Sequence, residues 1–193
     1  MDIDFINFIK VLITNPAEQE EKFNALISIK YIKQGDHFIT AGQFPKNIAF
    51  LKQGLFRYYY SNEQGNEFRK GFFLENSILS SYSAILENRS SYFTIEALED
   101  SVLERVNSAA LNLLFAEHPC WKDFLIKILS KAYLIKEDRE REFLLFDAEQ
   151  RYQSFQTRYP NLESRIKQHY VAPYLGIAPE SLSRIRKKYK SLT

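Results

Sequence analysis

The side chains with the clearest chemical potential lie near the C-terminus, in a segment that runs from Pro179 to Lys188. On a helix, one face of this segment would present only carboxylate, hydroxyl and cationic groups, carried by Glu180, Ser181, Ser183, Arg184, Lys187 and Lys188. Arginine can fork onto the O6 and N7 acceptors of guanine, and glutamate can accept a hydrogen bond from the cytosine amino group. Serine can bond phosphates or base edges, and lysine attracts phosphates whatever the sequence. The segment therefore carries the groups needed to read a DNA major groove.

The residues just before this segment predict the element that would position it, a helix-turn-helix. Residues 170–175 have a helical pattern, Gly176-Ile177-Ala178 would form a tight turn, and Pro179 suits the first turn of a second helix. Glycine can adopt the positive φ of such a turn, and the small Ala172 lets the two helices cross closely. The buried stripe would consist of Ile177, Leu182 and Ile185. A charged corner of a helical bundle has the same local pattern. A second observation is therefore needed to distinguish it from a DNA-binding helix-turn-helix.

The distribution of charge supplies that observation. Residues 148–193 carry nine basic and three acidic side chains, a net charge of +6, whereas residues 1–147 have a net charge of −4. Such asymmetry favours a C-terminal domain that binds a polyanion. Phosphates would be held mainly by Arg186, Lys187, Lys188 and Lys190. We therefore expect double-stranded DNA as a partner.

A long helical pattern, from Pro119 to about Phe146, precedes the basic domain. The spacing of its apolar residues alternates between four and three, which is typical of a coiled-coil seam; the seam would consist of Trp121, Leu125, Ile128, Ala132 and Ile135, and its register continues through Arg139 and Glu142. A second apolar row, made of Phe124, Leu129 and Tyr133, would pack against the chain's own N-terminal domain. The pattern predicts a dimerisation helix and hence a homodimer.

Residues 28–106 have a different pattern, with short aromatic and β-branched runs about every ten residues. Glycine-containing turns separate the runs, which predicts an antiparallel sandwich or barrel. Helices are expected near residues 5–13, 17–26, 109–117 and 148–158, with Ser108 and Asp147 as N-caps. The fold class is thus α+β, with a β-rich sensor-like domain over residues 1–118, a dimerisation helix over 119–146 and a DNA-binding domain over 147–193.

Two stretches resemble the Crp/Fnr family of bacterial transcription regulators. Residues 172–177 together with residues 180–185 are similar to its helix-turn-helix signature, and residues 93–103 are similar to the late strands of its cyclic-nucleotide-binding β-roll. The resemblance implies a double-stranded β-helix jelly roll, a dimerisation helix and a C-terminal winged helix-turn-helix. It places Glu180, Ser183 and Arg184 at base-reading positions. It also implies RNA polymerase as a partner and a small-molecule effector in the β-roll.

The departures from the family pattern concern the effector. Glu75 is present without its flanking glycines, and the position of the phosphate-binding arginine falls on Ser91, with Arg89 two residues upstream. A two-residue shift in a strand moves a side chain by about 6–7 Å, so the cation would miss the phosphate. We expect no cyclic nucleotide and no certain cofactor. An unknown effector would lie near Glu75, Ser77, Ser90 and Ser91.

Three further features limit the resemblance. The single cysteine, Cys120, excludes the cysteine-ligated cluster of the family's oxygen-sensing branch and is expected to pack in a helix. Pro173 lies within the first helix of the motif, where it removes a backbone donor. The sequence ends at Thr193, so we expect little or no wing.

Two other classes of protein fit parts of the sequence. The first is a cupin-like enzyme that binds a metal or a small molecule, but His37, His118 and His169 lie in three separate segments, and no catalytic constellation stands out. The second is an interaction module that has lost DNA binding. We expect no enzymatic activity, no catalytic residue and no metal. The acidic N-terminus and the lack of an apolar run of about 20 residues favour a cytoplasmic protein that does not enter the membrane.

Overall fold

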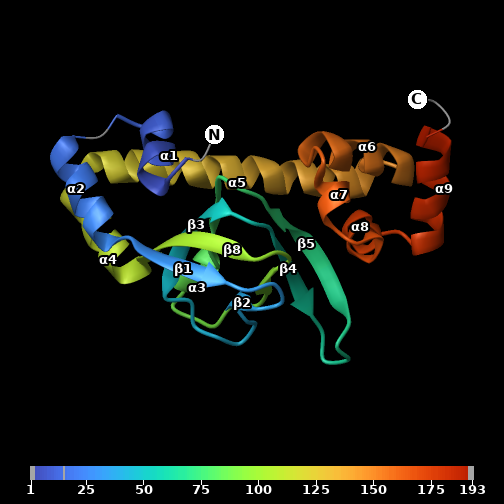
Figure 1. The fold of residues 1–193 in the computed structure, drawn as a ribbon, viewed down its shortest axis with the longest axis horizontal. Coiled ribbons are helices and arrows are strands. Elements are labelled where there is room, and N and C mark those ends of the chain that lie inside the picture. Colours follow the sequence, from blue (N-terminus) through green and yellow to red (C-terminus); the bar gives the residue numbers. More distant parts are fainter. Residues whose placement is uncertain (1–2, 15, 191–193) are drawn as a thin grey trace. The chain divides into compact units, whose positions relative to one another are not determined.

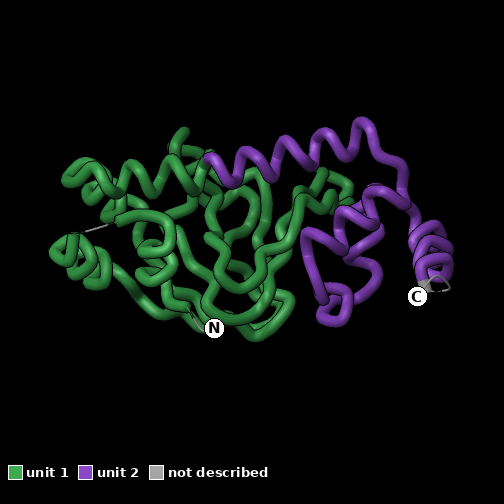
Figure 2. The backbone as a smooth tube through the Cα atoms, turned by 90° about the horizontal axis from the view of Figure 1, so that it is seen from above, with its two compact units in different colours: residues 1–129 green, residues 130–193 purple. Residues whose placement is uncertain are grey.

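A computed structural model describes residues 3–14 and 16–190. The chain divides into two compact units, residues 1–129 and residues 130–193, which Figure 2 shows in green and purple. The first unit holds the strands and the N-terminal helices, and the second holds the C-terminal helices (Figure 1). The α+β class with antiparallel sheets is confirmed. No helix in the described part of the chain is long and apolar enough to cross a membrane.

The β-region of the first unit consists of two four-stranded antiparallel sheets. Their strand orders are β1-β8-β3-β6 and β2-β7-β4-β5, so strands distant in sequence lie side by side in each sheet. The strands are β1 (Ser28–Ile32), β2 (His37–Ile39), β3 (Asn47–Gln53), β4 (Phe56–Ser61), β5 (Glu67–Phe73), β6 (Ser77–Leu79), β7 (Thr94–Ala97) and β8 (Ser101–Asn107). The stretch that resembles the family's late strands, residues 93–103, contributes to two strands that belong to different sheets. This interleaved order is that of a jelly roll.

The interior of the jelly roll is filled by apolar side chains from both sheets. The buried members of this cluster are Ile32, Ile39, Ala49, Leu51, Phe56, Leu79, Phe93, Ile95, Ala97 and Leu103, and Phe38, Tyr58 and Phe73 pack against it. The alternation along β4 explains this: Phe56 and Tyr58 face the interior, whereas Arg57 and Tyr59 lie on the opposite face. A short helix, α3 (Tyr82–Leu86), which the sequence pattern did not predict, separates β6 from β7.

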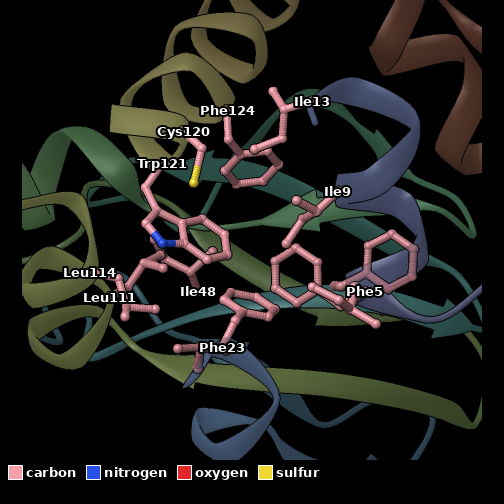
Figure 3. Packing of buried hydrophobic residues seen from close by; sticks show 13 residues of the cluster. Phe5, Ile9, Ile13, Phe23, Ile48, Leu111, Leu114, Cys120, Trp121 and Phe124 are labelled. Carbon is pink, nitrogen blue, oxygen red and sulfur yellow. The ribbon is translucent and has the colours of Figure 1, made fainter. Parts of the chain in front are cut away.

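A second core joins one sheet to the helices of the first unit (Figure 3). These helices are α1 (Phe5–Leu12), α2 (Ala17–Leu26), α4 (Ser108–Glu117) and the first half of α5 (Pro119–Leu145). The indole of Trp121 is fully buried, stacks on Phe23 at 5.2 Å between ring centroids, and donates its Nε1–H to Oε1 of Gln19 at 2.8 Å. Cys120 lies in the same cluster, where burial raises the pKa of its thiol. It is a packing residue, as expected.

The second unit contains the rest of α5 and four further helices, α6 (Ala148–Arg158), α7 (Leu162–Arg165), α8 (Gln168–Leu175) and α9 (Pro179–Lys190). Asp147 caps α6, and Gln150 completes a capping box, so the predicted N-cap is confirmed. The predicted cap at Ser108 is wrong by one residue, because the side chain of Asn107 accepts from the backbone of Ala109 and Ala110. Within the described residues no strand follows β8.

The first prediction concerns the hydrogen bond between Gln19 and Trp121. Replacing Gln19 by alanine leaves the fully buried indole N–H without its acceptor, and an unsatisfied buried donor costs about 1–3 kcal/mol. We expect the free energy of unfolding of the Gln19→Ala protein, measured by urea titration, to be lower by this amount. The exposed Glu21 on the same helix gives the control: Glu21→Ala should change the free energy of unfolding by less than about 0.5 kcal/mol. Equal effects of the two substitutions would contradict the assigned role.

Candidate DNA-binding surface and effector pocket

The turn between α8 and α9 has the geometry that its sequence predicted. Gly176 has φ 67° and ψ 36°, the left-handed conformation. Its N–H donates to the carbonyl oxygen of Pro173 at 3.3 Å, and the N–H of Ile177 donates to that of Ala172 at 3.1 Å. A Cβ at Gly176 would also lie 2.9 Å from the ring of Phe143. Glycine is therefore required here both by backbone conformation and by space. Pro173 is exposed and lies in the last turn of α8, which remains helical to Leu175.

The second helix of the motif, α9, buries one face and exposes the other. Leu182 and Ile185 are buried, as the stripe predicted, while Ile177 is half-buried. On the opposite face Glu180, Ser183, Arg184 and Lys187 are all exposed, and Ser181 is half-buried. Among the described residues neither Arg184 nor Lys187 takes part in an ion pair. The structure thus brings the predicted base-reading side chains together on one accessible helix face, and their contact with DNA remains a prediction.

Two cations of α9 differ from the others because they pair with carboxylates of the same unit. Arg186 donates from Nε to Oε1 of Glu163 at 3.0 Å, and its side chain is only 15% exposed. Burial disfavours its charge, but the bonds to Glu163 outweigh burial and raise the pKa of Arg186. The expected phosphate-binding role of Arg186 therefore needs correcting: its guanidinium fastens α9 to α7. The side chain of Lys190 lies outside the described residues.

Lys188 pairs with Glu149, at 2.6 and 2.8 Å from the two carboxylate oxygens, but both side chains are well exposed. A surface pair of this kind contributes about 0–1 kcal/mol, so a phosphate could replace the carboxylate at little cost. Lys188 therefore stays a candidate phosphate contact.

The half-buried carboxylate that pairs with Arg186 also accepts a hydrogen bond from a tyrosine. The hydroxyl of Tyr152 donates to Oε2 of Glu163 at 2.8 Å. Burial raises the pKa of Tyr152 to about 12, and the bond to Glu163 acts in the same direction. The phenol therefore remains a donor, and the three side chains form one network that ties α6, α7 and α9 together.

Two arginines close the C-terminal end of α8, whose last carbonyl groups have no partner inside the helix. Arg139 donates to the carbonyl oxygen of Tyr174 at 3.1 Å, and its guanidinium lies 3.7 Å from the centroid of the Tyr174 ring. Arg151 donates from Nε to the carbonyl oxygen of Leu175 at 2.9 Å and from Nη1 to that of Phe146 at 2.6 Å. The end of α5 and the start of α6 thus hold the turn of the motif from outside.

A buried ion pair completes this support. Arg158 on α6 donates to both carboxylate oxygens of Glu142 on α5, at 2.6 and 3.1 Å, and to the hydroxyl of the fully buried Tyr174 at 3.1 Å. Glu142 is 4% exposed. The sequence interpretation had placed Arg139 and Glu142 in the seam register; this is wrong, because both side chains bind residues of their own unit. Polar residues at two successive seam positions were the signal that could have revealed this.

The prediction that Trp121 belongs to the dimer seam is also wrong. Its indole is fully buried in its own core, so it has no surface to offer a partner helix. Leu125 and Ile128 are half-buried, and Ile128 packs against the same core. Ala132 and Ile135 are exposed. The second row, which was expected to pack against the N-terminal domain, does so only at Phe124. Leu129 and Tyr133 are exposed.

The predicted effector residues are engaged inside the first unit. Oε1 of Glu75 accepts from the N–H of Gly54 at 3.1 Å. The hydroxyl of the buried Ser91 accepts from Oγ of Ser81 at 2.9 Å and donates to the carbonyl oxygen of Phe93 at 2.7 Å. Ser77 and Ser90 are half-buried. That these four residues line an effector pocket stays a prediction.

The cation nearest to Ser91 in sequence lies at the surface. Arg89 pairs with Glu87, and its guanidinium lies 3.8 Å from the ring centroid of the exposed Tyr92. The roll interior beside Ser91 holds aromatic rings instead: Tyr58 stacks on Phe73 at 4.6 Å and approaches Phe93 at 5.9 Å. Arg89 therefore supplies no cation to an anionic ligand at this place, and the exclusion of cyclic nucleotides stays a prediction.

An ion network that the sequence pattern did not indicate covers the outer face of β4. Arg57, 6% exposed, donates to Oε2 of Glu96 at 2.6 Å and to Oε1 of Glu67 at 3.0 Å. Tyr59 donates to the same oxygen of Glu96 at 3.2 Å, and burial raises the pKa of Tyr59 to about 12. The network links the side chains of β4 to those of β5 and β7, and removing one partner would leave a buried charge without compensation.

The three histidines make contacts of different kinds. Nε2 of His37 lies 3.8 Å from Glu96, Nδ1 of His118 accepts from the N–H of Cys120 at 3.2 Å, and the ring of His169 lies 4.1 Å from that of Tyr170. Among the residues that the structure describes, no three His, Cys, Asp or Glu side chains are grouped so that they could hold a metal ion.

Comparison with known proteins agrees with this architecture. Residues 29–118 match the model of the cyclic nucleotide-binding domain. Over 91% of its length the chain is 26% identical to the fumarate and nitrate reduction regulatory protein of Salmonella typhi, of which the match covers 74%, and 24% identical over the same shares to that of Vibrio cholerae. These matches support the resemblance to the Crp/Fnr family of transcription regulators.

Two solved structures have a similar fold. FixK2 from Bradyrhizobium japonicum aligns with a TM-score of 0.75 at 15% identity, over 86% of this chain and 85% of that one. The c-di-GMP responsive regulator CLP of Xanthomonas campestris aligns with a TM-score of 0.71 at 17% identity, over 91% and 92% of the two chains. These alignments cover the jelly roll and the C-terminal helices together, so the resemblance seen in the sequence extends to the whole fold.

The second prediction concerns the ion pair behind the helix-turn-helix. Arg158→Met leaves the buried carboxylate of Glu142 without its cation, and breaking such a pair costs about 3–5 kcal/mol. We expect a loss of this size in the free energy of unfolding of the second unit, measured in urea. Arg141 gives a matched control, because its pair with Asp138 is exposed: Arg141→Met should cost less than about 1 kcal/mol.

Adding Glu142→Leu to Arg158→Met removes the orphaned charge and should restore much of the loss. A cost for Arg158→Met no larger than that for Arg141→Met would show that the pair does not hold the unit together.

Proposed function

We propose that the protein is a homodimeric, sequence-specific DNA-binding transcription regulator of the Crp/Fnr family, in which the jelly roll serves as a sensor. The observation that carries the proposal is the polar face of α9, which remains accessible while Leu182 and Ile185 anchor the helix from behind. A basic second helix of a helix-turn-helix is the element that enters a major groove. The curated relatives are regulatory proteins, and the proposal assigns no catalysis to the chain.

The side chains of α9 divide into two roles. Arg184, Glu180 and Ser183 would contact base edges, where a bidentate arginine discriminates guanine by about 1–3 kcal/mol. Lys187 and Lys188 would hold phosphates, and their contribution would be the same for every sequence. The half-buried Ser181 lies at the edge of this face and would bond a phosphate.

The homodimer would form along α5. Eight of the 17 large apolar side chains that are exposed among the described residues lie on this one helix. Ile126, Leu129 and Tyr133 recur at spacings of three and four and are 61%, 39% and 64% exposed. We propose this row as the contact with a second copy; the exposed Ala132 and Ile135 of the predicted seam lie on another side of the helix. Two copies would bring two recognition helices to neighbouring grooves.

Control of the regulator would come from the first unit. A ligand that binds the jelly roll more tightly in one state of the dimer would change how the two α9 helices are presented. RNA polymerase would be the partner of the DNA-bound form. A cytoplasmic location follows from this role.

The third prediction concerns sequence recognition. We expect Arg184→Ala to lose the preference for a guanine in selected binding sites, with a loss of about 1–3 kcal/mol for the preferred duplex and little change for random DNA. Lys187→Ala on the same face is the matched control: it should weaken selected and random duplexes alike, since a phosphate contact carries no sequence information. Gel-shift titrations on both duplexes measure this. If both variants lost affinity equally for selected and random duplexes, Arg184 would not be a base-reading residue.

The fourth prediction concerns the dimer. Tyr133→Glu places a charge in the proposed contact, and we expect it to shift the protein from dimer to monomer in sedimentation velocity. Tyr133 is preferable to Ile128, because Ile128 packs on its own core and a charge there would also destabilise the fold. Lys131→Glu, an exposed position away from this row, should leave the sedimentation coefficient unchanged. An unchanged dimer in the Tyr133→Glu protein would contradict the proposed interface.

A further inference from the structure

Three aromatic rings lie around the ammonium group of Lys70 in the first unit. Lys70 belongs to β5, which forms a hairpin with β4 (Figure 1). Nζ of Lys70 lies 5.0 Å from the ring centroid of Phe93, 5.5 Å from that of Tyr60 and 5.7 Å from that of Tyr58. All three distances are within the range of about 6 Å at which a cation is attracted to the face of a ring. Among the described residues no ion pair includes Lys70. Its charge is therefore held by rings and not by a carboxylate.

The rings are arranged as the walls of a box. The plane of Tyr60 is at 85° to that of Phe93, and the plane of Tyr58 is at 59° to it, with 5.9 Å between the centroids in each case. Rings that meet at such angles direct several negative faces toward one point, which is how aromatic cages bind ammonium ions. If the three rings only packed against one another, they would not need an ammonium group between them.

Two of the walls are fixed by the core. The ring of Tyr58 stacks on Phe73 and lies across Gly71, where an added Cβ would be 2.6 Å from it. Phe93 is 8% exposed, and the hydroxyl of Ser91 bonds both its carbonyl oxygen and its N–H. The box is thus preorganised on its inner side.

The third wall and the lysine face solvent. Tyr60 is 38% exposed and Lys70 is exposed. Lys70 is also the extra residue of a β-bulge, since Tyr58 pairs with Gly71 and Tyr59 pairs with Arg69. Its side chain can therefore leave the box without breaking a strand pair, and a ligand could enter from the same side.

The chemistry of the box favours one class of ligand over the lysine. A primary ammonium has three N–H donors that lose water when rings surround them, and lysine is strongly hydrated. A quaternary ammonium has the same charge without donors, so it enters an aromatic cage at a smaller loss of hydration. We propose that Tyr58, Tyr60 and Phe93 form a binding site for a small quaternary ammonium compound, which Lys70 fills when the ligand is absent. The role of this ligand as an effector rests on the proposed sensor function, whereas its binding to the site does not.

The fifth prediction tests the site by calorimetric titration of the full chain with choline chloride, at constant ionic strength. Lys70→Ala removes the competing cation, so choline should bind roughly two- to fivefold more tightly than to the wild type. Tyr60→Phe should bind as the wild type does, because the ring is kept, and Tyr60→Leu should lose most of the affinity. Tyr31→Leu, which changes an exposed tyrosine of the other sheet, should have no effect.

The neutral isostere 3,3-dimethyl-1-butanol separates charge from shape. It should bind at least several-fold more weakly than choline to the Lys70→Ala protein. Equal binding of the two compounds, or full affinity in the Tyr60→Leu protein at an unchanged melting temperature, would overturn the site. The affinity for DNA, measured separately with and without choline, reports on the sensor function: binding without an effect on DNA would leave the site in place and count only against its regulatory role.

Discussion

The DNA-binding half of the molecule depends on how the C-terminal end of α8 is closed. The last carbonyl groups of a helix need partners from elsewhere, and here the carbonyls of Tyr174 and Leu175 take theirs from Arg139 and Arg151. Gly176 can then turn the chain in the left-handed conformation and start α9 in the direction that exposes its polar face. Because both arginines belong to helices that precede the motif, the direction of the recognition helix is set by α5 and α6 together with the turn. The buried pair of Glu142 and Arg158 fixes those two helices to each other.

The helix α5 serves different neighbours along its length. Trp121 and Phe124 complete the core of the first unit, whereas Arg139 and Glu142 belong to the supports of the second. The exposed apolar row lies between these positions in the sequence and faces neither core. A helix that takes part in both units and in the proposed contact between copies is a physical route by which a ligand-dependent change in the jelly roll could reach α9.

Local patterns were sufficient to predict the elements that local chemistry determines. The turn at Gly176, the inward Leu182 and Ile185, the cap at Asp147 and the long helix from Pro119 all follow from spacing, glycine conformation and capping. Choices of partner could not be predicted in this way. The seam pattern fitted Trp121 because a periodic apolar row does not say whether its neighbour is the chain's own core or a second copy. Arg186 looked like a phosphate contact because Glu163, its partner, is 23 residues away. The cage around Lys70 likewise depends on Phe93, which belongs to a segment outside the hairpin.

The most direct test of the account is the affinity of the full chain for duplex DNA as a function of salt concentration. The account predicts that the logarithm of the association constant falls linearly with the logarithm of the salt concentration, with a contribution of about −0.9 to the slope from each phosphate contacted. It also predicts a steeper slope for the dimer than for a monomeric variant, because two α9 helices then contribute cations. An association constant that does not change with salt, or no binding to any duplex at low salt, would contradict the claim that α9 presents its cations to DNA.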